Sequence, residues 1–121
     1  MKFTNIFATA RQIIENDKEE LFTNFQKNNR PSGLDYIKKN CVDYFFDAIK
    51  DTVLSASESD KIVIKSISAE VIDYTDDNGV KIASIRYTCT MSINEEIEDF
   101  DEVWHFKYNG WSWLLAGIEQ V

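Results

Sequence analysis

The stretch that decides the fold is Asp76-Asp77-Asn78-Gly79-Val80-Lys81-Ile82-Ala83-Ser84-Ile85-Arg86-Tyr87-Thr88-Cys89-Thr90-Met91-Ser92-Ile93. It opens with a turn signal, because Asn-Gly favours the left-handed backbone of a two-residue hairpin. From Ala83 to Ile93, apolar residues alternate with polar ones. This alternation is typical of a strand with one face in the core and one face exposed. The stretch therefore predicts an antiparallel sheet.

The segments on both sides continue the period of two. Residues 61–75 are rich in Ile and Val, and their parity shifts between Ile64 and Ile67, which predicts a bulge. A third strand is expected after residues 94–96, with one face made by Phe100, Trp104, Phe106 and Tyr108. Asn109-Gly110 predicts a second two-residue hairpin, followed by a last strand over 111–118. Four antiparallel strands in chain order form a meander.

The first half of the chain has a helical period instead. Apolar residues at three- and four-residue steps predict an amphipathic helix over 4–28, which ends before Pro31. A second amphipathic helix is expected over 34–53, with Ser32 as its N-cap and Cys41 in its apolar stripe. Helices followed by a meander predict an α+β fold, a curved four-stranded antiparallel sheet packed on two N-terminal amphipathic helices. We expect a single domain over 1–121, with a helical half (1–56) and a sheet half (61–121).

Composition and charge exclude several functional classes. A chain of 121 residues with 44% apolar residues has the size and composition of one globular domain. Its 21 acidic and 13 basic residues give a net charge of -8. This charge argues against nucleic-acid or anionic-membrane binding, because phosphate contacts need clustered Lys and Arg.

The potential metal ligands are few. Cys41, Cys89 and the single His105 cannot supply the four ligands of a structural zinc site, so we expect no metal and no cofactor. Both cysteines are expected to be buried thiols in a reducing compartment. With no apolar stretch long enough to cross a bilayer and no signal-like start, the sequence predicts a cytoplasmic protein.

An acidic run is the most unusual local feature, because six of the eight residues from 95 to 102 are acids. Such a run is either a solvated loop or a negative field that steers a basic protein partner. Glu102 shares its parity with Trp104, so we expect it to point inward, where it needs an Arg or a hydroxyl partner; Arg86 on the neighbouring strand is the candidate. The predicted partner-binding residues are Glu95, Glu96, Glu98, Asp99 and Asp101.

Aromatic residues in the sheet half are predicted to fill the core or to line a pocket. They are Trp104, Phe106, Trp111, Trp113 and Tyr87. Trp111 and Trp113 share a parity, so they are expected on one face, with one of them at the mouth of a pocket. His105 falls on the face opposite Trp104, and the chain has no second His for a proton relay. We therefore expect no catalytic residues.

The last strands also carry a resemblance. Phe100-Asp101-Glu102-Val103-Trp104-His105-Phe106, followed by Asn109-Gly110-Trp111-Ser112-Trp113-Leu114-Leu115-Ala116-Gly117-Ile118, resembles the family typified by the tether subunit of the mitochondrial inner-membrane import motor. Bacterial proteins and a mitochondrial large-ribosomal-subunit protein share that domain. The resemblance is carried by residues 97–120. It implies a cone of the nuclear transport factor two-like type with a hydrophobic pocket, and a non-catalytic scaffold that docks proteins.

Two classes of function follow. The favoured one is a non-catalytic protein-binding module, in its sharpest form an acidic cytoplasmic inhibitor or immunity-type protein that masks a basic partner such as a toxin domain. An adaptor of protein translocation or of ribosome–membrane contact is the version implied by the resemblance, but the acidic charge and the missing N-terminal extension favour the inhibitor. The other class is a small-molecule pocket protein or a cone-fold enzyme such as a lyase or isomerase.

Overall fold

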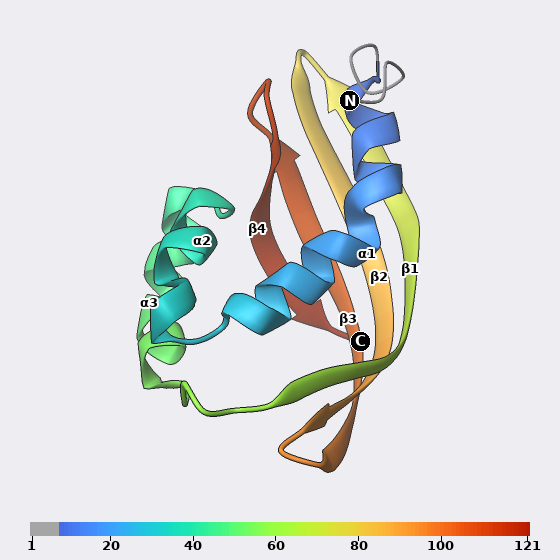
Figure 1. Ribbon diagram of the computed structural model, residues 1–121. Helices are drawn as coiled ribbons and strands as arrows, with labels where there is room; N and C mark the ends of the chain where they lie inside the picture. The colour runs from blue at the N-terminus through green and yellow to red at the C-terminus, as the bar shows by residue number, and fades with distance from the viewer. Residues whose placement is uncertain (1–7) are drawn as a thin grey trace.

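The molecule consists of a bent antiparallel sheet and a layer of helices. The computed structural model describes residues 8–121, and its strands lie in the order β1-β2-β3-β4, each antiparallel to the next. They are β1 (Ile62–Asp77), β2 (Val80–Ile93), β3 (Glu96–Tyr108) and β4 (Trp113–Gln120). Helices α1 (Ala10–Asn28), α2 (Leu34–Lys39) and α3 (Asp43–Ser55) precede them, and α1 crosses the sheet (Figure 1). The α+β prediction, a curved open sheet after N-terminal helices, is confirmed.

The alternation along β2 separates the two faces of the sheet as predicted. Ala83, Ile85, Tyr87, Cys89 and Met91 are buried in the core with residues of the helices. We call this side the inner face. Arg86 and Thr88, which alternate with these residues, are exposed on the other side, the outer face. Burial of the inner side chains stabilises the sheet, because apolar surface is removed from water mainly on that side.

The turn and the first bulge of the β1–β2 hairpin follow from local sequence. Asn78 and Gly79 both have positive φ, 52° and 80°, and connect the paired residues Asp77 and Val80, so the predicted two-residue hairpin is confirmed. The register of β1 against β2 shifts between Ile64 and Ser66, where the sequence predicts a bulge. A second shift, which we did not predict, lies between Val71 and Asp73.

The connection between β3 and β4 differs from the prediction. It has four residues, 109–112, and not the two of a tight hairpin. The side chain of Asn109 organises this loop, because its Oδ1 accepts from the backbone N–H of Trp111 at 2.8 Å and of Ser112 at 2.7 Å. The backbone N–H of Asn109 also donates to the carbonyl of Ser112 at 3.0 Å. The loop is therefore closed by an Asn side chain. Gly110 within it has a positive φ of 93°, which glycine adopts without strain.

Helix α1 begins later than the sequence predicts. Thr9 is its N-cap and forms a capping box with Gln12, and Ala8 and Thr9 are not helical. The predicted helical residues 4–7 lie outside the described residues. The C-terminal end agrees with the prediction, since α1 stops at Asn28 shortly before Pro31.

The predicted single helix over 34–53 is wrong, because residues 40–42 interrupt it. The backbone N–H of Leu115 donates to the carbonyl of Asn40 at 2.8 Å, and that of Val42 donates to the carbonyl of Leu115 at 3.0 Å. Cys41 thereby forms a parallel bridge to β4, and the segment becomes the separate helices α2 and α3. The backbone groups of Asn40 and Val42 thus form hydrogen bonds to β4 in place of the helical hydrogen bonds expected for a continuous helix.

The predicted N-cap is also wrong. Ser32 lies within the short 3₁₀ turn η2 (Pro31–Gly33), and its hydroxyl donates to Glu58 Oε2 at 2.7 Å. Helix α2 has no side-chain cap at its start. Ser32 therefore ties η2 to the loop before β1. Hydrogen bonds from its hydroxyl and from its backbone N–H are the main cause of the lowered pKa of the Glu58 carboxyl.

Two hydrogen bonds fix α1 on the inner face. The hydroxyl of Tyr87 donates to the carbonyl of Lys18 at 2.6 Å, and the indole N–H of Trp113 donates to the carbonyl of Ala10 at 2.8 Å. The ring of Phe22 packs against that of Tyr87 at a tilt of 35°, with centroids 4.7 Å apart. Within the described chain, the helices include none whose length and apolar character would suffice for a membrane span.

Candidate binding surface

The structure divides the acidic run into three environments. Glu95, Glu96 and Glu98 are exposed at the far end of the β2–β3 hairpin. Asp99 and Asp101 lie on the outer face of β3, opposite Thr90 and Thr88 of β2. Glu102 is buried on the inner face. Alternation along β3 produces this division, because residues 99 and 101 share one face and residue 102 lies on the other.

The first group, which we call the acidic hairpin end, consists of Glu95, Glu96 and Glu98. In Figure 1 this hairpin projects beyond the helices at the end of the sheet away from the β1–β2 turn. Among residues 8–121, none of these three carboxylates has a salt bridge or a side-chain hydrogen bond. Lys61 and Lys65 line a pocket together with Glu95, but no salt bridge joins them to it, so the three carboxylates keep their charges exposed to solvent.

Glu95 has an unusual backbone. It follows Asn94 in the two-residue turn, and the two residues have positive φ of 73° and 53°. Asn tolerates this left-handed region, but a residue with a long side chain pays an energetic cost there that Gly avoids. The turn thus holds a carboxylate where a glycine would be favoured for stability. Strained positions of this kind are concentrated at functional sites.

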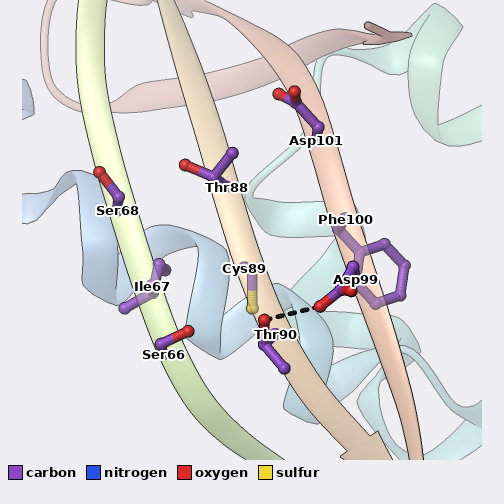
Figure 2. Close-up of a pocket in the computed structure, with 9 residues that line it drawn as sticks. All are labelled: Ser66, Ile67, Ser68, Thr88, Cys89, Thr90, Asp99, Phe100 and Asp101. Atoms are coloured by element: carbon purple, nitrogen blue, oxygen red, sulfur yellow. Dashed lines mark hydrogen bonds between the residues drawn. The ribbon is translucent and has the colours of Figure 1, made fainter.

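Asp99 and Asp101 border a groove of about 450 Å³ on the outer face. Figure 2 shows its polar side chains on three neighbouring strands, with the helices behind the sheet. Register places them in two rows across the strands. The Asp99 row is Ser66, Thr90 and Asp99, and the Asp101 row is Ser68, Thr88 and Asp101. Both rows therefore present two hydroxyls and one carboxylate.

The two carboxylates of the groove have different partners. Arg86 binds Asp101 with both ends of its guanidinium, Nε at 3.0 Å from Oδ1 and Nη2 at 2.7 Å from Oδ2. This pair lowers the pKa of Asp101, chiefly through the hydrogen bonds, and raises the pKa of Arg86. Asp99 instead accepts one hydrogen bond, from the Thr90 hydroxyl at 2.7 Å.

The predicted pairing of Glu102 with Arg86 is wrong, although its inward direction is confirmed. Glu102 is 8% exposed and accepts from the indole N–H of Trp104 at 3.2 Å and from the amide of Gln120 at 2.6 Å. Arg86 lies on the outer face and cannot reach the inner one. The partners of Glu102 come from its own strand and from β4, and they satisfy a carboxylate that would be costly to bury alone.

The predicted aromatic set belongs to the core, with one exception. Trp104, Phe106, Trp113 and Tyr87 are all buried. Trp104 contacts Phe22, Phe25, Tyr87 and Phe106, with ring centroids between 4.9 and 6.2 Å apart. The prediction for Trp111 is wrong, because this residue is 88% exposed in the β3–β4 loop. Strand alternation stops at Tyr108, and Trp111 lies in the four-residue loop that follows. Trp111 therefore does not share a face with Trp113.

A small apolar cavity of about 140 Å³ lies between the helices and the inner face. Its wall includes the apolar residues Phe25, Ile37, Ile49, Trp104, Leu115 and Ile118 and the polar residues Gln26, Asn29 and Thr52. Of the predicted pocket aromatics, Trp104 reaches it, and Tyr87, Phe106, Trp111 and Trp113 are not part of its lining.

His105 takes part in a side-chain array that sequence reasoning missed. Its Nδ1 lies 2.7 Å from Ser84 Oγ, and its Nε2 lies 2.8 Å from Glu119 Oε1. The carboxylate can only accept, so Nε2–H donates to it, and in the neutral ring Nδ1 accepts from the serine hydroxyl. The register of β2, β3 and β4 brings the three residues together on the outer face. Strand alternation in the sequence predicted this face for His105 but not the array.

The Ser84–His105–Glu119 array fits a cross-strand tie better than a nucleophilic site. Ser84 and His105 lie on the two central strands, where the backbone N–H groups belong to the ladders on either side. A nucleophilic serine also needs free N–H donors beside it to stabilise an oxyanion. The array therefore connects three strands through side chains.

The cysteines are free and buried, as predicted. Burial raises the pKa of the Cys41 thiol to about 12 and also raises that of Cys89. At neutral pH both are protonated and poorly nucleophilic. Within residues 8–121, no group of three or more His, Cys, Asp or Glu is arranged to hold a metal ion.

Comparison with known proteins adds no family to this geometry. No protein-family model, curated protein or solved structure matches the chain. The resemblance of residues 97–120 to the import-motor tether family therefore stays a prediction.

Proposed function

We propose that this chain is a non-catalytic module that binds a basic protein partner through its acidic hairpin end. The observation that carries the proposal is the exposure of Glu95, Glu96 and Glu98 with no cation paired to them in the described part of the chain. Unpaired exposed charge raises the rate at which an oppositely charged protein is captured. The net charge of -8 acts in the same direction over a longer range.

The backbone of the turn supports a binding role. Glu95 keeps a carboxylate at a left-handed position, φ 73°, where glycine would relieve strain. The hairpin that carries it is long and paired through Ile93 and Glu96 up to the turn itself. The charges are therefore held on a fixed scaffold, and less side-chain and backbone entropy is lost on binding than with a flexible tail.

The specific form that we favour is an inhibitor that covers a basic functional surface of its partner, such as the active site of a toxin domain. An acidic protein on such a surface associates fast and excludes an anionic substrate. An adaptor for protein translocation would use the same kind of contact with a different partner. The identity of the partner separates these two forms.

The decisive experiment measures association with that partner at two salt concentrations. The partner is first isolated from the native host on immobilised protein, identified and purified. We expect the triple variant E95Q/E96Q/E98Q to associate about tenfold more slowly at low salt, with a weaker salt dependence, because steering is electrostatic. A variant with three exposed acids of the helices replaced, E19Q/D47N/D51N, has the same net charge and is the control. Equal association rates for the two triple variants would refute the proposal.

A second candidate function is supported by the 140 Å³ cavity, which would hold a small apolar molecule. Mass spectrometry of a solvent extract of the purified protein tests it. A stoichiometric apolar compound, together with quenching of tryptophan fluorescence when that compound is added back, would favour this function. An empty extract and unchanged fluorescence with small aromatic compounds would remove it.

A further inference from the structure

The outer-face groove contains two equivalent rows, of which one holds a guanidinium group. In the Asp101 row, the carboxylate receives the side chain of Arg86, which lies two positions along the facing strand from the direct partner of Asp101, Thr88. Both carboxylate oxygens are used in this fork. The contact shows how an aspartate on the outer face of β3 presents its carboxylate to an arginine.

The Asp99 row repeats this geometry without an arginine. Asp99 lies two residues before Asp101 on the same strand and face, so Thr88 occupies the diagonal position that Arg86 has relative to Asp101. Thr88 is too short to make the contact. Asp99 Oδ1 accepts from the Thr90 hydroxyl, and within residues 8–121 its Oδ2 has no hydrogen-bond donor. Asp99 is exposed at the side of the groove that continues into the acidic hairpin end.

The surroundings of Asp99 leave room for a long side chain. The strands beside it present the small polar residues Ser66, Ser68 and Thr88, which is why the outer face is hollow here. The hydroxyls of Ser66 and Thr88 can accept further N–H groups of a planar donor. The groove therefore combines an accessible carboxylate, free hydroxyl acceptors and space in one place.

We propose that the Asp99 row receives an arginine side chain of the basic partner, in the same way that the Asp101 row receives Arg86. The proposal rests on the proposed function, since it names the part of a basic partner that enters the groove. An arginine is preferred to a lysine, because the guanidinium can bridge the carboxylate and a neighbouring hydroxyl within one plane. The acidic hairpin end attracts the partner, and the Asp99 row fixes its register.

The test uses acetylated and amidated hexaarginine and hexalysine as probes, with backbone amide NMR spectra recorded at low salt. We expect hexaarginine to shift residues 66–68, 88–90 and 99–101, and hexalysine to bind more weakly at the same place. D99N removes the charge and keeps an acceptor for Thr90, and we expect it to weaken hexaarginine binding about fivefold, the effect of one charged contact at a partly exposed site.

The sharpest variant fills the site from within. T88R places an arginine at the diagonal position of Asp99, so it should occupy the row and weaken hexaarginine binding about tenfold or more. A48R adds the same charge on the exposed side of α3 and is its matched control, with an expected change of less than about twofold. T88Q, of similar length and without charge, should bind hexaarginine almost as the parent does. The NMR spectrum and a denaturation curve of each variant show that it is folded.

The outcomes separate the two proposals. Equal binding by T88R and A48R, or hexaarginine shifts confined to residues 94–98, would overturn the arginine site and leave the acidic hairpin end as the binding surface. Equal affinity for the two peptides would also overturn the preference for arginine. Shifts by both peptides only on the helices, or no shifts with either peptide at low salt, would overturn the proposed function together with the site.

Discussion

The inner and outer faces of the sheet contain side chains of opposite character, although they alternate along the same strands. On β2 the inner face carries Ile85, Tyr87 and Cys89, all buried, and the outer face carries Arg86 and Thr88, both exposed. The inner face is held to the helices by packed aromatic rings and by two hydrogen bonds to α1. The outer face is covered by no helix among the described residues, and its side chains are tied mainly to one another.

The difference shows where stability and recognition are located. Inner side chains lose water on folding, so changes there alter the free energy of unfolding. The charged side chains of the outer face remain in water, so their ion pairs contribute little to stability and can be exchanged for contacts with a partner. Variants on the two faces should therefore differ in the size of their effect and in the property that they change.

The largest effect is expected for Trp104→Ala on the inner face. Trp104 is 2% exposed and contacts the rings of Phe22, Phe25, Tyr87 and Phe106. Its removal leaves a cavity, and we expect the free energy of unfolding to fall by about 3–5 kcal/mol. Urea denaturation followed by circular dichroism measures it.

The neighbouring Val103→Ala on the outer face is the control for that change. Val103 is only half-buried, so the expected loss is below about 1 kcal/mol. Similar losses for the two variants would contradict the assignment of the faces.

An intermediate effect is expected for Tyr87→Phe. The variant keeps the stacked ring and removes the hydroxyl that donates to the carbonyl of Lys18 at 2.6 Å. The lost hydrogen bond should cost about 1 kcal/mol. Hydrogen exchange of α1 amides should accelerate along with the lower denaturation midpoint, because this bond holds the helix on the sheet. An unchanged exchange rate in α1 would show that the Tyr87 hydrogen bond is not needed to hold the helix on the sheet.

A small effect of opposite sign is expected for Glu95→Gly. The left-handed backbone at this position, φ 73°, is free of steric cost for glycine, so the protein should gain about 0.5–1 kcal/mol. Association with the basic partner should slow at the same time, because one exposed charge is lost. Thermal denaturation and association kinetics of this single variant measure both. A less stable protein would mean that the Glu95 side chain makes a favourable contact at the turn.

The smallest effect is expected for the pH dependence of the Arg86–Asp101 pair. Arg86 lowers the pKa of Asp101, so the pair stabilises the fold above the ordinary carboxyl pKa of about 3.9, and its contribution disappears as the pH falls through the lowered value. In R86Q the NMR titration midpoint of the Asp101 carboxyl should rise toward its ordinary value. The stability difference between R86Q and the parent should vanish in acid. A midpoint that does not move would assign the low pKa to another cause.

Much of the fold could be predicted because its signals are local. The alternation from Ala83 to Ile93 identified the inner face, and Asn78-Gly79 identified its hairpin. The parity shift near Ile64 identified the first bulge. Each of these depends on neighbouring residues in the chain, so no knowledge of the register between strands is required.

The errors arose where distant segments meet. The apolar period runs through Cys41 without a break, and only its bridge to Leu115 divides the helix. The exposure of Trp111 depends on the length of a loop that Asn109 closes with its side chain. The Ser84–His105–Glu119 array and the two rows of the groove needed the register of adjacent strands. Parity alone, however, places Arg86 and Glu102 on opposite faces and argues against their pairing.

The bridge between Cys41 and Leu115 also limits how copies of this chain can add to one another. Filaments built by edge-to-edge strand pairing need two open, straight borders on every copy. At the β4 border, the backbone N–H and carbonyl of Leu115 are already bonded to Asn40 and Val42. The β1 border is bent by register shifts after Ile64 and Val71. With one border blocked at Leu115 and the other kinked, edge-to-edge pairing of copies is disfavoured.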